Sequence, residues 1–264
     1  MVKVADIEMH VLDYSPTMDD VPVLLLHGAF GSTRLWEGVA ERLATCRRVI
    51  VPDMRGRGRT PLGNRSLSPA QLASDTFKML DALGVRSVHA TGHSAGSIAL
   101  IEMLRRRPQR ILTATLVGSP AMVIGETVGP LAGLSADLRR MAAGQDALDL
   151  TLNQFREQWK RHAPEPERFE ELAARLAARQ RIEVDPAKAA GKRPVMVVRA
   201  ARDALIAPEA FDRLAERIRA ASIAHYPDGT HALPRQHAQQ LATDISAFIA
   251  ATGDHACAPI ATAQ

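Results

Sequence analysis

The chain has 264 residues, of which 46% are hydrophobic and 23% charged, and its formal net charge is +4. A chain of this length can form one domain with an insertion, and it contains neither an apolar run of the ~20 residues that span a bilayer nor an N-terminal signal core. Basic residues are interleaved with 29 acidic ones and aromatic residues make up 4% of the chain, so we expect a cytoplasmic protein that binds neither nucleic acid nor membrane.

The opening residues 2–14 alternate loosely between apolar and polar, which predicts antiparallel edge strands. Residues 21–26 form a continuous apolar run, as expected of a strand buried on both faces of a parallel sheet. Strand and helix patterns then alternate, with strands at 48–51, 88–92, 111–117, 194–200 and 222–226. This alternation predicts an α/β fold, a mostly parallel central sheet with helices on both faces.

The alternation stops between residues 121 and 189, where the sequence reads as helices. A helical insertion after a core strand would lie over the carboxyl end of the sheet. We therefore predict a helical cap at 121–189 on a core domain formed by 1–120 and 190–251. Residues 252–264 are small, polar or alanine-rich, which predicts a flexible tail.

Two cysteines, Cys46 and Cys257, are far apart in the sequence, and neither lies in a C-x-x-C pair. We predict plain thiols, with no disulfide and no zinc site. His225, His231 and His237 share no helical face, so no metal site is predicted. The loop at 52–60 contains G-x-G without a third glycine or a following helix, so we expect no dinucleotide and no other cofactor.

The segment Gly92-His93-Ser94-Ala95-Gly96 has the pattern G-x-S-x-G of a nucleophile elbow. The turn from strand to helix is so sharp that the flanking glycines must lack side chains, and the serine is exposed. The helix that follows directs unpaired N–H groups at the serine, so the N–H of Ala95 can bind an oxyanion. The alternative is a turn of small residues without catalytic meaning.

A serine nucleophile needs a base, and the base needs a carboxylate that fixes its tautomer. Asp203 follows the strand at 194–200 and His231 follows the strand at 222–226, in the order serine, acid, histidine that this elbow requires. Parallel strands bring all three residues to one edge of the sheet. We predict the triad Ser94, Asp203 and His231, with Asp228 as a minor alternative acid.

These motifs make the chain resemble the α/β-hydrolase superfamily, in its cap-bearing branch of small bacterial esterases, lactonases and cofactor-free haloperoxidase-like enzymes. Besides the elbow, Asp203 and His231, the resemblance rests on His27-Gly28-Ala29 and on Asp53–Thr60, which matches D-x-R-G-x-G-x-S with threonine in place of serine. It implies that the N–H of Ala29 is the second oxyanion donor, with Phe30 as the nearby alternative. His27 is expected to shape the loop by hydrogen bonding.

We therefore predict a serine hydrolase that cleaves a small or medium, largely apolar ester or lactone through an acyl-enzyme, as a monomer or homodimer. Carbon–carbon bond hydrolases, thioesterases and perhydrolases share this triad. A receptor-like protein that binds a small molecule without turnover is the alternative from another class. Phe30, Phe155 and Trp159 are the predicted substrate-binding residues, although core packing explains the two cap aromatics equally well.

Overall fold

A computed structural model gives the structure of residues 1–15, 20–120, 156–177 and 185–254. Much of the predicted cap therefore lies outside the described residues, as do Phe155 and Cys257. Within the predicted cap, the structure describes 156–177 and 185–189. This part holds the short helix η3 (Pro166–Arg168), the helix α6 (Phe169–Ala177) and all but the last residue of α7 (Pro186–Ala190).

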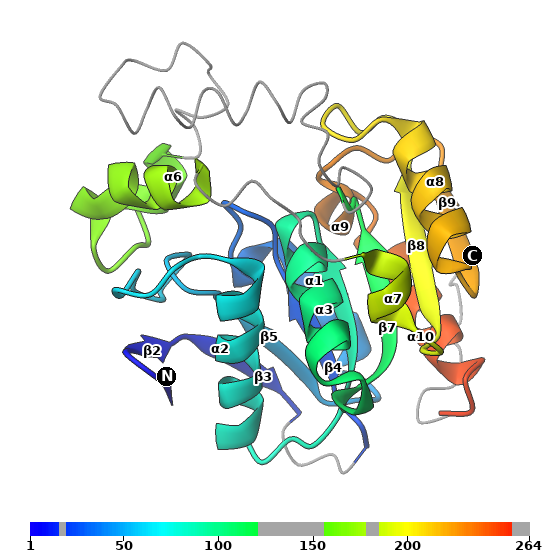
Figure 1. The fold of residues 1–264 in the computed structure, drawn as a ribbon, viewed down its shortest axis with the longest axis horizontal. Helices are drawn as coiled ribbons and strands as arrows, with labels where there is room; N and C mark the ends of the chain where they lie inside the picture. Colours follow the sequence, from blue (N-terminus) through cyan, green and yellow to red (C-terminus); the bar gives the residue numbers. More distant parts are fainter. Residues whose placement is uncertain (16–19, 121–155, 178–184, 255–264) are drawn as a thin grey trace.

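A seven-stranded sheet forms the centre of the described part, with the strand order β3-β5-β4-β6-β7-β8-β9 (Figure 1). β3 pairs antiparallel with β5, and all other neighbours are parallel, which confirms the predicted fold class. The two strands β1 (Val2–Val4) and β2 (Ile7–Met9) form a separate antiparallel pair. The strands of the large sheet are β3 (Val11–Tyr14), β4 (Val23–Leu26), β5 (Val49–Pro52), β6 (Val88–His93), β7 (Ile111–Val117), β8 (Val195–Ala200) and β9 (Ser222–Tyr226).

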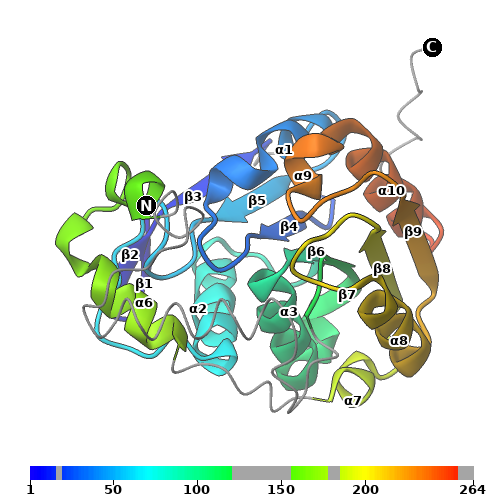
Figure 2. The same cartoon turned by 90° about the horizontal axis from the view of Figure 1, so that it is seen from above.

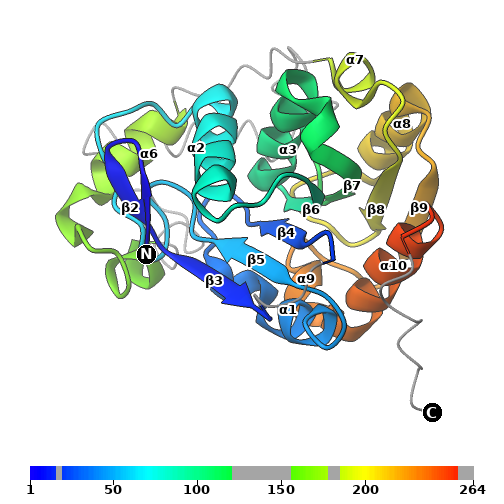
Figure 3. The same cartoon turned by 90° about the horizontal axis from the view of Figure 1, so that it is seen from below.

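Helices cover both faces of this sheet, as Figures 2 and 3 show from opposite sides. One face carries α2 (Pro69–Ala82), α3 (Ala95–Arg106) and α8 (Pro208–Ile218). The other carries α1 (Glu37–Leu43), α9 (Leu233–Gln236) and α10 (Ala238–Ala250). Two short helices, η1 (Thr33–Trp36) and η2 (Pro108–Arg110), precede α1 and β7. Ser68 caps the start of α2, because its hydroxyl accepts the Gln71 N–H at 3.2 Å.

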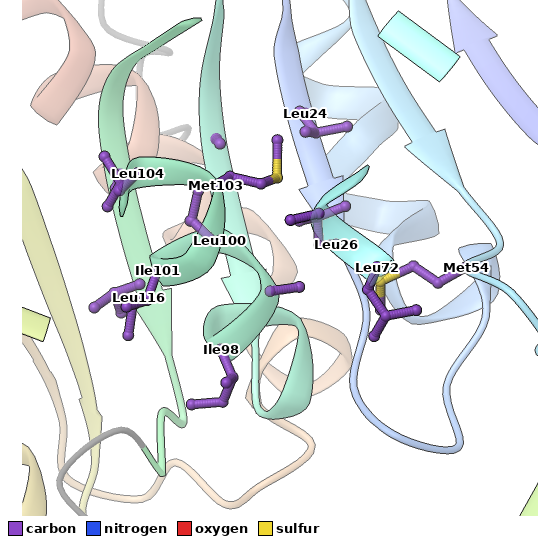
Figure 4. Packing of buried hydrophobic residues seen from close by; sticks show 14 of the residues in the cluster. Leu24, Leu26, Met54, Leu72, Ile98, Leu100, Ile101, Met103, Leu104 and Leu116 are labelled. Atoms are coloured by element: carbon purple, nitrogen blue, oxygen red, sulfur yellow. The ribbon is translucent and has the colours of Figure 1, made fainter. Parts of the chain in front are cut away.

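Two hydrophobic clusters, one on each face, hold these layers together. Figure 4 shows Leu100 and Met103 of α3 close to Leu24 and Leu26 of β4. All four residues of β4 are fully buried, because both faces of this central strand are covered. The continuous apolar run at 21–26 is explained by this position.

One cysteine prediction is wrong. Cys46 is not a plain thiol but is disulfide-bonded. Nearby, the carboxylate of Asp254 bonds to buried Arg47 at 2.9 Å and to buried His89 at 2.9 Å. The chain is therefore held at residue 254, within the segment predicted to be flexible.

The loop after β5 is organised by the buried carboxylate of Asp53. This carboxylate accepts the N–H groups of Thr33 at 2.6 Å and Arg59 at 2.9 Å, and the Thr60 hydroxyl donates to the Asp53 carbonyl at 2.7 Å. Threonine thus makes the bond that a serine hydroxyl could make at this position. Gly58 has φ +53°, and a Cβ on it would lie 2.3 Å from the Asp53 carboxylate.

Replacing Gly58 by alanine is expected to destabilise the protein far more than the same change at Gly84. Both glycines have positive φ, at which alanine costs about 1–2 kcal/mol, but a Cβ on Gly84 meets nothing within 4 Å. Asp53 is fixed by its hydrogen bonds and cannot move aside, so we expect a loss above about 3 kcal/mol for Gly58→Ala. Urea denaturation of both variants measures the difference, and equal losses would contradict this explanation.

Candidate active site

Ser94 lies at the turn between β6 and α3, with a positive φ of 51° and a ψ of −120°. This conformation is strained for a residue with a side chain. The flanking glycines permit it: a Cβ on Gly92 would lie 2.7 Å from the Gly96 backbone, and a Cβ on Gly96 would lie 2.4 Å from the Leu26 carbonyl. The structure therefore has the geometry of a nucleophile elbow.

Two hydroxyl groups that the sequence did not single out support this turn. The Ser97 Oγ lies 2.5 Å from the Ser94 carbonyl and 2.7 Å from the Ser119 Oγ. A hydroxyl has one hydrogen, so if Ser97 donates to the Ser94 carbonyl, it accepts its second bond from Ser119. Ser119 follows β7, and no local sequence pattern predicts its hydrogen bond with Ser97.

Asp203 and His231 form a hydrogen-bonded pair, with 2.8 Å between Asp203 Oδ2 and His231 Nδ1. The side chain of Asp203 is fully buried, and its Oδ1 accepts the N–H groups of Leu205 at 2.8 Å and Ile206 at 3.0 Å. The Asp203 carboxylate can only accept a hydrogen bond from Nδ1, so the proton of the neutral His231 imidazole lies on Nδ1. Nε2 is thus left free to accept a proton.

The alternative acid, Asp228, is not in this pair. Its side chain is 62% exposed and lies 3.4 Å from the Nε2 atom of His237. The structure therefore brings His231 together with Asp203, the residue far from it in sequence. Gly118, directly after β7, borders the pair, since a Cβ there would be in ordinary contact at 3.5 Å from both His231 Nδ1 and Asp203 Oδ2.

His93 connects the elbow to the His231 loop. Its Nε2–H donates to the His231 carbonyl at 2.7 Å, and the two imidazole rings lie 4.7 Å apart between centroids. Burial, together with the neighbouring His231, lowers the pKa of His93 to about 3, so its ring stays neutral near physiological pH. The base predicted from sequence therefore packs against the residue directly before Ser94.

The turn Gly28–Gly31 lies against the nucleophile, since a Cβ on Gly28 would be 3.2 Å from the Ser94 Cβ. His27 shapes this turn: its Nδ1–H donates to the Gly28 carbonyl at 2.8 Å, and its Nε2 accepts the Met54 N–H at 2.9 Å. Burial is the main cause that lowers the pKa of His27 to about 4. Its two hydrogen bonds require the neutral ring.

Comparisons with known proteins agree with this arrangement. The sequence model described as "alpha/beta hydrolase fold" matches residues 21–153, which is about half of the chain. The chain belongs to the α/β-hydrolase family.

Among curated relatives of this α/β-hydrolase, the "Putative carbamate hydrolase RutD" of Azorhizobium caulinodans is 35% identical over 106 residues, 39% of each chain. The "Dihydrolipoyllysine-residue acetyltransferase component of acetoin cleaving system" of Pseudomonas putida is 26% identical over 239 residues, 86% of this chain. The match spans 63% of the length of that relative. Both matches thus cover less than two thirds of the relative.

Among solved structures, the enol-lactonase of Burkholderia xenovorans LB400 is similar, with a TM-score of 0.71 and 20% identity. The alignment covers 94% of this chain and 98% of the lactonase. This likeness concerns the fold.

Of the three predicted substrate-binding residues, the structure describes Trp159 and Phe30, and both belong to an aromatic cluster with Phe169. Trp159 is 6% exposed, and its indole N–H donates to the Gly56 carbonyl at 2.8 Å. Phe169 of α6 is fully buried and packs against Trp159, at 5.5 Å between ring centroids, and against half-buried Phe30, at 6.4 Å. Trp159 therefore attaches the segment 156–177 to the loop after β5, and Phe30 joins the same aromatic cluster.

In the ranges that the structure describes, no group of three or more histidine, cysteine, aspartate or glutamate residues could hold a metal ion. Over the same ranges, no helix has the length and apolar character that crossing a membrane requires.

The free energy of unfolding of the protein is expected to fall as the pH drops from about 6.5 towards 4. The unfolded chain binds protons on histidine near pH 6.5, whereas folded His27 and His93 bind theirs only near pH 4 and 3. Each of these two buried rings therefore lowers the free energy of unfolding by up to about 1.4 kcal/mol for each unit by which the pH falls in this window. Urea denaturation at pH 7.5, 6.5, 5.5 and 4.5 measures how the free energy of unfolding depends on pH. In His93→Gln this slope should be smaller by about 1.4 kcal/mol per pH unit, the contribution of one proton. An equal slope in that variant would contradict the assignment.

Proposed function

We propose that this α/β-hydrolase is a serine hydrolase that cleaves a carboxylic ester or a lactone through an acyl-enzyme on Ser94. The observation that carries the proposal is the Asp203–His231 pair, packed through His93 against an elbow serine at φ 51°. A hydroxyl at a strained turn, together with an imidazole whose proton lies on Nδ1 in the neighbouring loop, supports acyl transfer as the reaction.

In the proposed mechanism, His231 Nε2 accepts the Ser94 proton while Oγ attacks the substrate carbonyl carbon. The resulting oxyanion accepts hydrogen bonds from the N–H groups of Ala29 and Ala95, the second of which begins α3. His231 then protonates the leaving alcohol. Water, deprotonated by the same imidazole, releases the acid from Ser94.

A carbamate is the second candidate substrate. The matched relative named as a carbamate hydrolase shares 35% identity over 106 residues. A carbamate carbonyl is attacked in the same way as an ester carbonyl, but it is less electrophilic because nitrogen donates electron density to it. Turnover of both classes by one site is therefore chemically consistent, with the ester cleaved faster.

The test measures hydrolysis of p-nitrophenyl acetate, butyrate, octanoate and N-methylcarbamate, and of a γ-lactone, alongside labelling by a fluorophosphonate. We expect turnover of at least one ester or the lactone, and mass spectrometry should find the phosphonate on Ser94. Labelling with turnover of the carbamate alone would select the second candidate. Absence of both turnover and labelling would refute the hydrolase proposal and favour a receptor-like role.

The remaining expectations belong to the same proposal. Residues 121–189 form a cap that sets substrate choice, and the enzyme acts as a monomer or homodimer without a cofactor. The proposed cytoplasmic location rests on the sequence. The disulfide at Cys46 weighs against it, because structural disulfides are commoner in oxidising compartments.

A further inference from the structure

The turn Gly28–Gly31 closes with a hydrogen bond from the Gly31 N–H to the Gly28 carbonyl at 3.2 Å. Its central peptide joins Ala29 to Phe30. In a four-residue turn this peptide can take two opposite orientations, those of type I and type II turns. A flip exchanges the sides on which the Ala29 carbonyl and the Phe30 N–H lie. One peptide therefore decides whether this side of the turn offers a hydrogen-bond donor or an acceptor.

In the structure this peptide has the orientation of a type I turn. A type II turn requires a positive φ at its third residue, and Phe30 does not have one. In a type I turn the N–H groups of the second and third residues, here Ala29 and Phe30, point to similar sides. The Ala29 carbonyl points away from them, and it accepts a hydrogen bond from Arg57 Nε–H at 2.8 Å.

Arg57 is well fixed for this contact. Its side chain is fully buried, and Nη1–H donates to the Arg55 carbonyl at 2.6 Å. The preceding residue, Gly56, has its own carbonyl held by the indole of Trp159. A guanidinium carries only donors and keeps its proton at any ordinary pH, so Arg57 can hold a carbonyl but not an N–H. A flipped turn would place the Phe30 N–H against this donor.

We propose that Arg57 is a positioning residue for the oxyanion hole, because it holds the Ala29 carbonyl so that the Phe30 N–H stays beside the Ala29 N–H, on the side of Ser94. A Cβ on Gly28 would lie 3.2 Å from the Ser94 Cβ, so this turn borders the nucleophile directly. After a flip, a carbonyl oxygen would face the developing negative charge. The inference rests on the proposed function of Ser94.

Arg55 provides a matched control in the same loop. It is also fully buried, but its guanidinium pairs with Asp75 at 2.7 Å and Asp6 at 2.7 Å. No contact that the structure gives for its guanidinium involves the turn Gly28–Gly31. Removal of either arginine should destabilise the fold, whereas only removal of Arg57 should alter binding of an oxyanion.

The experiment compares Arg57→Met, Arg57→Lys and Arg55→Met in full-length protein. It measures kcat and KM for the preferred ester, and the Ki of a trifluoromethyl ketone with the same acyl chain, whose adduct carries an oxyanion. Loss of one oxyanion donor costs about 10²–10³ in rate, so partial misorientation in Arg57→Met is expected to lower kcat and raise Ki by about 10- to 100-fold. KM should change less than about threefold, and Arg57→Lys should recover part of the loss.

A folded Arg57→Met protein with unchanged kcat and Ki would overturn the inference, as would an equal loss in Arg55→Met. If Arg57→Met does not fold, the wild type supplies the test, because the amide proton resonances of Ala29 and Phe30 should move downfield when the ketone adduct forms. Absence of a downfield shift of the Phe30 resonance would refute the proposal.

Adduct formation separates the two proposals. If the wild type forms no adduct with the ketone, the proposed function fails and the role of Arg57 fails with it. If the wild type forms the adduct, Ser94→Ala does not, and Arg57→Met binds the ketone as the wild type does, only the role of Arg57 is refuted.

Discussion

Replacing Ser94 by alanine is expected to lower kcat by about 10⁶-fold, to the level left by binding and the oxyanion donors. The reason is that alanine removes the Oγ on which the proposed acyl-enzyme forms, while the flanking glycines that permit the φ of 51° stay as they are. Ester hydrolysis and fluorophosphonate labelling measure the loss. The stability of the variant should stay close to that of the wild type, because no hydrogen bond of the elbow backbone depends on the Ser94 hydroxyl.

Ser68→Ala is the matched control for this variant. Its hydroxyl caps α2 by accepting the Gln71 N–H, so the alanine variant should lose about 1 kcal/mol of stability but no activity. Ser94→Ala should therefore lose activity without losing stability, and Ser68→Ala should lose stability without losing activity. Residual activity above about 1% in Ser94→Ala would mean that another group performs the reaction, and the acyl-enzyme proposal would fail.

Asp203→Asn is expected to lower kcat by about 10⁴-fold with little change in KM. The asparagine oxygen can still accept the N–H groups of Leu205 and Ile206, as Oδ1 of Asp203 does. Its NH₂ group then faces His231 Nδ1 and donates to it. This moves the imidazole proton to Nε2, and the base can no longer accept the Ser94 proton.

Asp228→Asn is the control, since this exposed carboxylate lies near His237 rather than His231. We expect its kcat to stay within about twofold of the wild type. The rate should be measured from pH 5 to 9, because loss of the correct tautomer should persist across the whole range in Asp203→Asn. Equal effects of both substitutions would show that the pairing of His231 with Asp203 does not direct the base.

The sheet and the elbow follow from patterns that are local in the sequence. The continuous apolar run at 21–26 predicted a strand buried on both faces of a parallel sheet, and the glycines around Ser94 permit a turn that side chains would block. These are local constraints, which each segment carries in its own residues. The chain order of Ser94, Asp203 and His231 added the prediction of a triad, because parallel strands end at one edge.

Which polar groups meet depends on how distant segments pack together. It paired His231 with Asp203, 28 residues away, rather than with Asp228, and joined His93 to the His231 carbonyl across 138 residues. It also placed Arg57 on the Ala29 carbonyl and Ser119 on Ser97, and it overturned the prediction that Cys46 is a free thiol. Such contacts are fixed by how the layers pack and where the loops cross. A buried donor can form a hydrogen bond with any well-placed acceptor. No local pattern of residues encodes that choice, so the supports of the site became visible only when distant loops were brought together.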